Sequence, residues 1–353
     1  MSRPWPVIVL GGTGYVGGEM LRLVAGHPQL VLASAVSTSR AGGAVAASFA
    51  HLSPSYPEAR FVSLDTAVER LGDAPHWVVL SAAPHGASAE MVVRLLDAAD
   101  SAGVELTVVD ASADFRFSDA NAFEGVYGQP HSAPGRLPEF HCAVPEHADR
   151  IDTPHAAHPG CFATAMLLAI VPLVQAGAST TSFHVSAVTG STGAGRTPRV
   201  TTHHPVRQSN LFAYLPLAHR HAPEVRALTR AATGRDIDLH FVPHSGPLSR
   251  GIHATIFAER GSGNDAADLY ALLTEYYAGS DFVGIELDPP RVKDIVGSNY
   301  ARLSVTAADD TIVVCSVLDN LVKGAAGGSI QWVNRLLGLP ETLGLTTPAA
   351  GWV

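Results

Sequence analysis

The stretch "VIVLGGTGYVGG", residues 7–18, decides how the first part of the chain folds. Four apolar residues run up to Gly11, and Gly14 and Gly17 follow at intervals of three. The apolar run predicts a buried strand, and the residues after the glycines predict a helix. Glycines at such a junction permit a tight turn and let backbone N–H groups approach a phosphate at the helix N-terminus. We therefore predict a dinucleotide-binding turn, with an ordinary strand–helix turn as the alternative.

The residues beyond this turn repeat the same alternation. Apolar runs at 30–37, 76–84 and 105–114 predict strands, and 18–28 and 89–103 predict helices. Alternation at this spacing is typical of βαβ units around a parallel sheet. We therefore predict a Rossmann-type dinucleotide-binding domain at the N-terminal end of the chain.

The end of the second predicted strand indicates which dinucleotide binds. An NAD-binding unit places an acidic residue there to hold the ribose hydroxyls. This chain has "AVSTSRAGG" instead, in which Ser37, Ser39 and Arg40 suit a 2′-phosphate. We predict NADP as the cofactor. The alternative is that Arg40 is only a solvated loop charge.

The second half of the chain has a different pattern. A Gly- and Pro-rich connection over 115–157 leads into a predicted helix at 160–177. Strand-like runs follow at 181–195, 238–246, 250–259 and 300–320, with few helices between them. This indicates an α+β domain on a mostly antiparallel sheet, in a chain of overall α/β class. The stretch 325–338 predicts a last helix that returns to the first domain.

Composition excludes several classes of protein. The 353 residues are 46% hydrophobic and 16% charged, with a net charge of −9. This charge argues against nonspecific nucleic-acid binding. No apolar run approaches the ~20 residues that span a bilayer, and the three cysteines include no C-x-x-C pair. We expect a cytoplasmic protein without nucleic-acid, membrane or metal partners.

One cysteine stands where its thiol could react. In "HPGCFATA", residues 158–165, Cys161 follows Pro159-Gly160 and opens the predicted helix. The positive end of a helix favours the thiolate over the thiol, which makes Cys161 a candidate nucleophile. The alternative is a buried structural cysteine, the role we expect for Cys142 and Cys315.

A thiolate nucleophile needs a group that handles protons. The stretch "HRHAPEV", residues 219–225, places His219 and His221 two apart, so on an extended strand they would share a face. Metal binding is the competing use of such histidines. It is disfavoured because the chain has no H-E-x-x-H and no matching cysteine spacing.

Taken together, these motifs resemble a known family. "GGTGYVGGEMLRL", "SADFR", "HPGCFATA", "TGSTGAGR", "HRHAPEV", "SRGI" and "LDNLVKGAAG" are similar to N-acetyl-γ-glutamyl-phosphate reductases of the aspartate-semialdehyde dehydrogenase superfamily. The likeness is collinear from about Val7 to Leu345. It implies an NADP-binding domain over 1–157, completed by 324–353, and a catalytic and dimerisation domain over 158–323. It also implies NADPH-dependent reduction of N-acetyl-γ-glutamyl phosphate in arginine biosynthesis by a homodimer or homotetramer.

The resemblance also implies roles for single residues. Cys161 matches the family's nucleophile and His221 its acid/base. His219 is the alternative candidate for the acid/base. Substrate contacts are expected from Arg116, Arg196 and Arg250. The residues expected to line the cofactor site are Gly11, Thr13, Gly14, Tyr15, Val16, Gly17, Ser37, Ser39, Arg40, Ser81, Pro84, Ser112 and Asn320.

Three other interpretations stay open. The stretch with His203, His204 and Arg207 resembles the branch that reduces carrier-protein-linked aminoadipyl phosphate in lysine biosynthesis, whereas Phe162 favours the acetylglutamyl substrate. An aspartate-semialdehyde dehydrogenase would use the same thiol chemistry. A protein that kept the fold and only senses NADP is the third.

Overall fold

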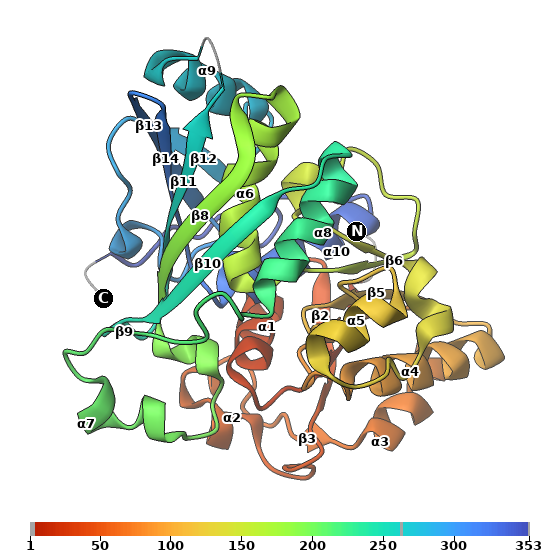
Figure 1. Ribbon diagram of the computed structural model, residues 1–353. Coiled ribbons are helices and arrows are strands. Elements are labelled where there is room, and N and C mark those ends of the chain that lie inside the picture. The colour runs from red at the N-terminus through yellow and green to blue at the C-terminus, as the bar shows by residue number, and fades with distance from the viewer. Residues whose placement is uncertain (1–3, 262–263, 352–353) are drawn as a thin grey trace. The chain divides into compact units, whose positions relative to one another are not determined.

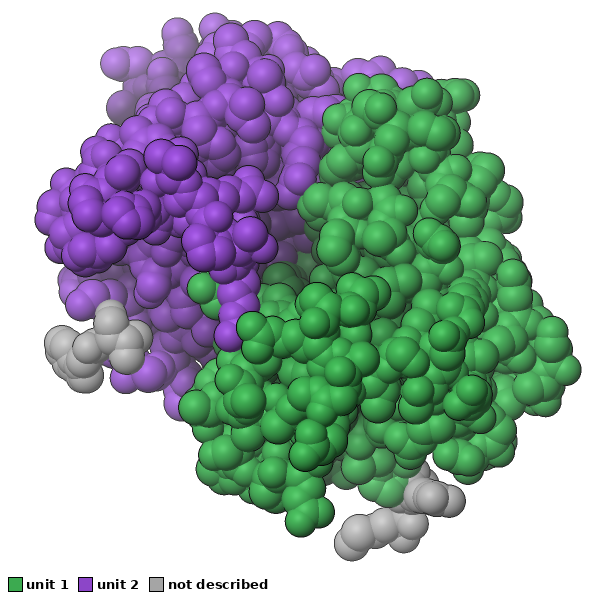
Figure 2. Space-filling view, turned by 90° about the horizontal axis from the view of Figure 1, so that it is seen from below, with its two compact units in different colours: residues 1–142, 150–158, 325–346 green, residues 143–149, 159–324, 347–353 purple. Residues whose placement is uncertain are grey.

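The computed structural model describes residues 4–261 and 264–351, which form two compact units. Figure 2 shows the two units in different colours. Unit 1 holds the parallel sheet and unit 2 the mixed sheet. Among the described residues, unit 1 comprises those up to Cys142, 150–158 and 325–346, and unit 2 comprises 143–149, 159–324 and those from Thr347 onward.

Unit 1 is built on a seven-stranded sheet in which all strands are parallel. Their order across the sheet is β3 (Phe61–Val62), β2 (Leu30–Val36), β1 (Trp5–Leu10), β4 (His76–Ser81), β5 (Glu105–Asp110), β7 (His155–Ala157) and β6 (Phe140–Cys142). The last four residues of β1 are fully buried, as expected for a strand covered on both faces. The predicted Rossmann-type architecture is therefore confirmed.

Unit 1 also contains helices. They are α1 (Tyr15–Gly26), α2 (Val45–Ser48), α3 (Leu64–Glu69), α4 (Ser88–Ala102), α5 (Ala120–Tyr127) and α10 (Gly327–Leu336). Of these, α1, α3, α4 and α10 pack against this sheet. The C-terminal α10 packs against β5, β7 and α1 and so completes unit 1. The stretch 115–157, expected as an irregular connection, also supplies α5 and two short strands, β7 and the edge strand β6.

Unit 2 is built on a mixed seven-stranded sheet, mostly antiparallel as predicted. Only β12 with β13, and β8 with β10, pair in parallel. The order is β12 (Val283–Glu286), β13 (Ala301–Ala308), β14 (Thr311–Leu318), β11 (Ile252–Arg260), β8 (Ser179–Thr189), β10 (Asp238–Ser245) and β9 (Phe212–Ala213), as Figure 1 shows in part.

Three helices of unit 2 pack on one face of its sheet. They are α6 (Cys161–Ala176), α8 (His221–Thr233) and α9 (Ala266–Tyr276); the short α7 (His204–Arg207) lies outside this layer. Residues of β8 that point to the helices, such as Phe183 and Val185, are buried. Their neighbours His184 and Ser186 are exposed. Along β8, the second face of this sheet is therefore open to solvent at these two residues.

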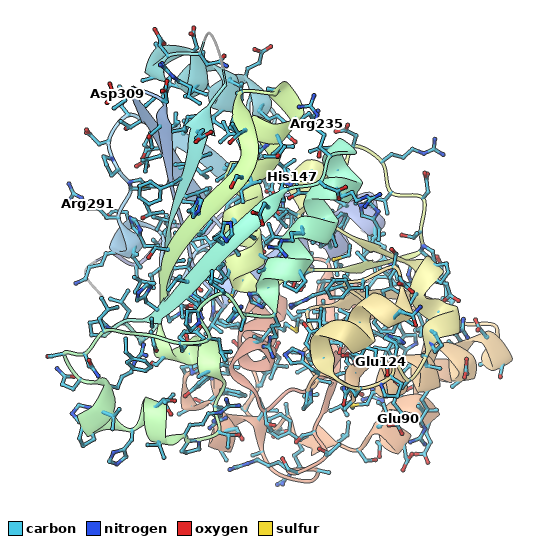
Figure 3. All side chains as sticks on the ribbon, viewed as in Figure 1. Glu90, Glu124, His147, Arg235, Arg291 and Asp309 are labelled. Carbon is cyan, nitrogen blue, oxygen red and sulfur yellow. The ribbon has the colours of Figure 1, made fainter. Side chains whose placement is uncertain are left out.

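The observed units depart from the expected domain boundaries in two places. Residues 143–149 and the described residues from Thr347 onward belong to unit 2. The first segment is held there by side chains: Lys323 Nζ donates to Glu146 Oε1 at 2.5 Å, and both groups are buried. His147, labelled in Figure 3, lies 2.9 Å through its Nε2 from the hydroxyl of Tyr277.

Helix α6 is apolar on all sides and forms the centre of unit 2. Pro172 lies inside it and has no N–H to donate to the carbonyl of Leu168, one turn earlier. The hydroxyl of Tyr277 donates to that carbonyl instead, at 2.6 Å. Across residues 4–261 and 264–351, every helix is too short or too polar to cross a bilayer.

Candidate active site

The glycine turn of unit 1 has the close packing that the sequence predicts. Gly11 has φ +70°, and a Cβ there would lie 2.4 Å from the carbonyl oxygen of Ala82. A Cβ on Gly17 would lie 2.4 Å from the carbonyl oxygen of Gly11. Helix α1 begins directly after Gly14, and no side chain caps it. The turn therefore presents the N-terminus of α1, the kind of place where a pyrophosphate binds.

The predicted 2′-phosphate residues follow β2. Ser37 is buried, and its hydroxyl accepts from the N–H of Arg40 at 3.2 Å and lies 3.5 Å from the hydroxyl of Thr13. Ser39 and Arg40 are exposed. The loop therefore joins the glycine turn through Ser37 and presents a hydroxyl and a guanidinium outward. This arrangement fits a 2′-phosphate, and no carboxylate is present at 37–43 to hold a ribose diol.

Ser81 does not present its hydroxyl to a ligand. It lies 2.6 Å from the hydroxyl of Ser88, which donates to the buried carboxylate of Asp110 at 2.8 Å. Burial, and secondarily the charge of Asp114, raises the pKa of Asp110 to about 6. The carboxylate of Asp114 accepts from the N–H groups of Gly86 and Ala89 and so holds the loop that contains Pro84.

Ser112 lies at the end of β5, near the same loop. Its hydroxyl is 3.2 Å from Nδ1 of His85, and that nitrogen also accepts from the N–H of Ala113. The loops after β4 and β5 are thus tied to each other at the carboxyl ends of adjacent strands, where α/β sheets bind nucleotides.

Cys161 is the first residue of α6, as predicted. Gly160 is the N-cap residue, and its N–H donates to Oε1 of Glu224 at 2.7 Å. Gly324 packs directly on Cys161, because a Cβ there would lie 2.7 Å from Cβ of Cys161. The thiol therefore sits at the positive end of a buried helix, in a place with little space beside it.

The expectation that His219 and His221 share a strand face is wrong. His221 begins helix α8, with Pro223 and Glu224 in its first turn. Proline and glutamate are both favoured in the first turn of a helix, so the sequence itself indicated a helix here. The two imidazoles are nevertheless close, with 4.7 Å between ring centroids.

The two histidines have different surroundings. Nδ1 of His219 accepts from the N–H of His221 at 3.2 Å, so a neutral His219 carries its proton on Nε2. Rings of Phe162, Tyr214 and Phe241 lie edge-on to His219. Burial, and secondarily the charge of Arg220, lowers the pKa of His219 to about 4. His219 is therefore held as a neutral ring.

Tyr214 was not singled out from the sequence, and no local pattern marked it. Burial raises the pKa of its hydroxyl, and the negative charge of Cys161 raises it further. Tyr214 is thus a neutral hydroxyl within electrostatic reach of Cys161.

The three expected substrate arginines have different environments. Arg116, in unit 1, is buried, and its guanidinium donates to the carbonyls of Ala111 and His158. Arg250, in unit 2, forms a two-point ion pair with the buried carboxylate of Asp319, at 3.0 and 3.1 Å. Arg196 is exposed.

Asn320 uses its amide within unit 2. Its Oδ1 accepts from the N–H of Gly251 at 2.7 Å, and its Nδ2 donates to the hydroxyl of Thr192 at 3.0 Å. Together with Asp319, it ties the turn before Gly324 to the loops next to β8 and β11. Gly324 itself belongs to a π-helical segment, Val322–Ala326. Such segments are frequent at functional sites.

The remaining cysteines lie away from helix ends. Cys142 and Cys315 are half-buried members of strands β6 and β14 rather than fully buried residues. Burial raises the pKa of Cys315, although hydrogen bonds with Ser304 and Thr255 partly oppose this. Cys315 is therefore a poor nucleophile.

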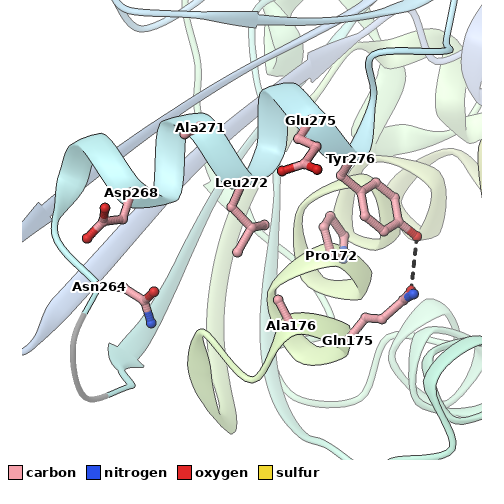
Figure 4. A pocket seen from close by; sticks show the side chains of 9 residues that line it. All are labelled: Pro172, Gln175, Ala176, Asn264, Asp268, Ala271, Leu272, Glu275 and Tyr276. Carbon is pink, nitrogen blue, oxygen red and sulfur yellow. Dashed lines mark hydrogen bonds between the residues drawn. The ribbon is translucent and has the colours of Figure 1, made fainter.

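A pocket of about 720 Å³ lies between α6 and α9 (Figure 4). It is lined by Pro172 and Gln175 of α6 and by Asp268, Glu275 and Tyr276 of α9. These residues belong to the C-terminal end of α6, whereas Cys161 begins that helix. The pocket is therefore separate from the thiol.

Comparisons with known proteins agree with this geometry. Residues 6–148 match the family described as semialdehyde dehydrogenase, NAD binding domain, and residues 161–320 match semialdehyde dehydrogenase, dimerisation domain. The fold and the thiol site thus define a semialdehyde dehydrogenase. N-acetyl-γ-glutamyl-phosphate reductases from Ectopseudomonas mendocina and Pseudomonas aeruginosa are 40% and 39% identical to this chain; each alignment covers 97% of this chain and 98% of the relative. The chain belongs to the N-acetyl-γ-glutamyl-phosphate reductase family.

More distant solved structures share the fold. Aspartate semialdehyde dehydrogenase II from Vibrio cholerae is similar with a TM-score of 0.66 at 18% identity, covering 96% of this chain and 99% of that one. The enzyme from Candida albicans with NADP gives 0.64 at 15% identity, with coverage of 96% and 99%.

Proposed function

We propose that this chain catalyses the NADPH-dependent reduction of N-acetyl-γ-glutamyl phosphate to N-acetylglutamate 5-semialdehyde and phosphate. Two relatives of about 40% identity over 97% of the chain carry the name of that activity. The observation that carries the proposal is the position of Cys161, alone among the three cysteines at the start of a helix.

The first chemical step belongs to Cys161. Its thiolate attacks the acyl carbonyl, a C–S bond forms, the C–O bond to phosphate breaks, and a thioester remains. The helix N-terminus stabilises the thiolate and the negative charge that develops on the carbonyl oxygen. The covalent route replaces one difficult displacement by two easier steps.

NADPH, when bound, supplies the hydride. The residues proposed to hold it fit its phosphates. Gly11, Gly14 and Gly17 form a tight turn, and a Cβ would not fit at Gly11. Ser39 and Arg40, proposed for the 2′-phosphate, are exposed in the loop after β2. Thr13, Tyr15 and Val16 belong to the glycine turn. Pro84, Ser112 and Asn320 are proposed for the nicotinamide end, with Ser81 as a support through its buried hydrogen bond.

His221 is the proposed acid/base. After hydride transfer the tetrahedral alkoxide on sulfur re-forms its carbonyl, the C–S bond breaks, and the leaving sulfur of Cys161 takes a proton from the imidazolium of His221. The neutral imidazole that remains can take the proton of the thiol back for the next turnover. His219 is less suited, because its Nδ1 is engaged by the N–H of His221 and its pKa is lowered to about 4 by burial. We assign His219 to the orientation of His221.

The three arginines have different proposed roles toward the substrate. Arg250 and Arg196 are proposed to bind the anionic groups of the substrate, with Arg250 oriented by Asp319. Arg116 was expected in the same role, but its hydrogen bonds to two main-chain carbonyls favour a supporting one. We further propose a homo-oligomer that acts in the cytoplasm, in keeping with three cysteines that form no disulfide with one another.

Substrate assays test the proposal directly. The full chain is incubated with NADP⁺, phosphate and, separately, N-acetylglutamate 5-semialdehyde, aspartate semialdehyde or carrier-linked aminoadipate semialdehyde, and NADPH formation is followed. Turnover is expected with the first aldehyde. Turnover confined to either of the others would overturn the assignment.

Replacement of the thiol tests the chemistry. Cys161→Ser should lower kcat at least 10⁴-fold and leave NADPH binding unchanged. Cys142→Ser, in a strand of unit 1, is the matched control and should retain wild-type kcat. An active Cys161→Ser enzyme would refute the covalent route.

A further inference from the structure

Unit 2 contains a buried ion pair, one member of which directly precedes Gly324. The chain has only two lysines, Lys293 and Lys323, and Lys323 is fully buried. Its Nζ donates to Oε1 of Glu146 at 2.5 Å, and only 3% of the Glu146 side chain is exposed. Nζ also lies 5.5 Å from the centre of the Phe282 ring. We call Lys323 and Glu146 the buried pair.

A pair of this kind is weak evidence for stability. Moving an ammonium and a carboxylate out of water costs free energy that their attraction often fails to return, so apolar residues of similar volume are often at least as stable there. The pair does fix the two segments that carry its charges, because any separation leaves a buried charge unpaired. It is therefore better suited to positioning than to stability.

The segment that Lys323 fixes forms one side of the thiol site. Gly324, the next residue, packs on Cys161, because a Cβ there would lie 3.0 Å from Cα and 2.7 Å from Cβ of Cys161. Lys323 and Gly324 both belong to the π-helical segment Val322–Ala326. A displacement of this segment therefore changes the space beside the proposed nucleophile.

The turn that leads into this segment is held by its own hydrogen bonds and by side chains that leave it. The buried carboxylate of Asp319 accepts from the N–H groups of Leu321 and Val322, at 2.8 and 2.9 Å, which fixes the shape of the turn. Its place in unit 2 depends on side chains that reach outside it. Asp319 reaches Arg250, and Lys323 reaches the other half of the buried pair.

Glu146 is in turn connected to the helix of the nucleophile. Its neighbour His147 lies 2.9 Å through Nε2 from the hydroxyl of Tyr277. That hydroxyl donates to the carbonyl of Leu168 in α6, at 2.6 Å. The buried pair therefore links the π-helical segment to the same helix that begins with the proposed nucleophile. The contact with Gly324 closes this series of links.

We propose that the buried pair positions the thiol of Cys161. It holds Gly324 against Cys161 and so limits the thiolate to the orientation from which it attacks a carbonyl. Lys323 and Glu146 are thus positioning residues that act through Gly324 and do not touch the substrate. This inference rests on the proposed function and adds the groups that hold its nucleophile in place.

Replacing both charges together tests this role without leaving one of them unpaired. In Lys323→Met/Glu146→Leu, apolar side chains of similar volume replace the pair, so the urea midpoint should stay close to that of the wild type. The kcat for oxidation of N-acetylglutamate 5-semialdehyde should fall about tenfold. Alkylation of Cys161 by iodoacetamide, followed by mass spectrometry of its peptide, should become about threefold faster, because space opens beside the sulfur.

An exposed ion pair of the same unit supplies the matched control. Arg230 and Asp236 lie 3.2 Å apart, and their side chains are 69% and 76% exposed. Arg230→Met/Asp236→Leu makes the same chemical change away from Gly324. It should retain the wild-type kcat and the wild-type alkylation rate.

The alkylation rate decides the proposal. An unchanged or slower rate in the folded Lys323→Met/Glu146→Leu variant would overturn it, whatever the kcat, because the pair would then not act through the thiol. If that variant does not fold, Glu146→Gln makes the same test: it keeps an oxygen for Nζ and removes the charge. Faster alkylation then supports the role, and the wild-type rate overturns it. Alkylation requires no substrate, so it tests the buried pair even if the aldehyde assay contradicts the proposed function.

Discussion

At the scale of single residues, the space beside Cys161 is decided by Gly324. A methyl group there would lie 2.7 Å from Cβ of Cys161 and 3.0 Å from its Cα, closer than real Cβ contacts. Gly324 also donates its N–H to the carbonyl of Asp319, which fixes the turn that carries it. A substitution therefore has to displace the nucleophile, the turn or both.

We expect Gly324→Ala to lower kcat by about 100-fold, because small misplacements of a nucleophile have large effects on rate. The measurement is kcat for aldehyde oxidation together with the rate of alkylation of Cys161. Gly279→Ala is the control, since no atom lies within 4 Å of its Cβ position and it should retain wild-type values. A wild-type kcat for Gly324→Ala would show that the site tolerates the methyl group.

Glu224 connects α6 and α8, the helices that begin at the proposed catalytic residues Cys161 and His221. Its buried carboxylate accepts from the N–H of Gly160, the residue before the nucleophile, and it lies one helical turn after His221. One hydrogen bond thus fixes the start of α6 relative to the start of α8. Glu224 is a positioning residue in this arrangement.

Glu224→Gln keeps an oxygen that accepts this bond, whereas Glu224→Ala leaves the N–H of Gly160 buried without it. We expect Glu224→Ala to lose 1–3 kcal/mol of unfolding free energy and more than tenfold in kcat. Glu224→Gln should recover most of both. Urea titration and steady-state assays compare the two variants. Equal losses in both would indicate that the charge, not the hydrogen bond, matters.

Residue roles are predictable from sequence only where they follow from local position. Cys161 was predicted at a helix start because Pro159-Gly160 precedes an apolar run. Gly324, by contrast, matters through a contact with a residue 163 positions earlier, and nothing in its own neighbourhood reports that contact.

At the scale of elements, α6 depends on a side chain from another part of the chain. Pro172 leaves the carbonyl of Leu168 without its helical donor, and the hydroxyl of Tyr277 takes that place just after α9. The same hydroxyl is 2.9 Å from Nε2 of His147 and, because it donates to Leu168, it accepts from that imidazole. One phenol therefore joins three segments of unit 2.

Tyr277→Phe removes this hydroxyl and nothing else. We expect a loss of 1–3 kcal/mol in unfolding free energy, since a buried carbonyl and a half-buried imidazole both lose a partner. Tyr276→Phe is the matched control: among the described residues its hydroxyl bonds only the exposed Gln175, at 3.3 Å, and its loss should stay below about 0.5 kcal/mol. Similar values for the two variants would contradict the role given to Tyr277.

Periodicity predicted most elements of both sheets, but it failed at "HRHAPEV". Two polar residues spaced by two fit a strand, while Pro223 and Glu224 fit the first turn of a helix, and the second signal was the right one. Tertiary contact between α8 and α6 stabilises this helix.

At the scale of the whole molecule, the sequence predicted the two sheets but not how the chain is shared between the units. Segment 143–149 lies in unit 2 because Glu146 pairs with Lys323, 177 positions away. The sequence around Glu146 and around Lys323 does not indicate this pairing. A buried ion pair forms only when the folded chain brings both charges together and satisfies them.

Buried histidines give the folded chain a defined response to pH. Burial lowers the pKa of His147, in unit 2, and of His155, in unit 1, to about 4, with smaller contributions from neighbouring charges and hydrogen bonds. An unfolded histidine titrates near 6.5. Between these values the unfolded chain binds protons that the folded chain does not. Stability is therefore complete above pH 6.5 and is lost as the pH falls toward 4.

We expect the unfolding free energy to fall by up to about 1.4 kcal/mol per pH unit for each such histidine between pH 6.5 and 4. Urea titrations at several pH values measure this slope. His147→Gln removes one titrating group and should flatten the slope by up to that amount, whereas His51→Gln, at an exposed position, should leave it unchanged. A slope that is the same in His147→Gln as in the wild type would mean that His147 is not held neutral by the fold.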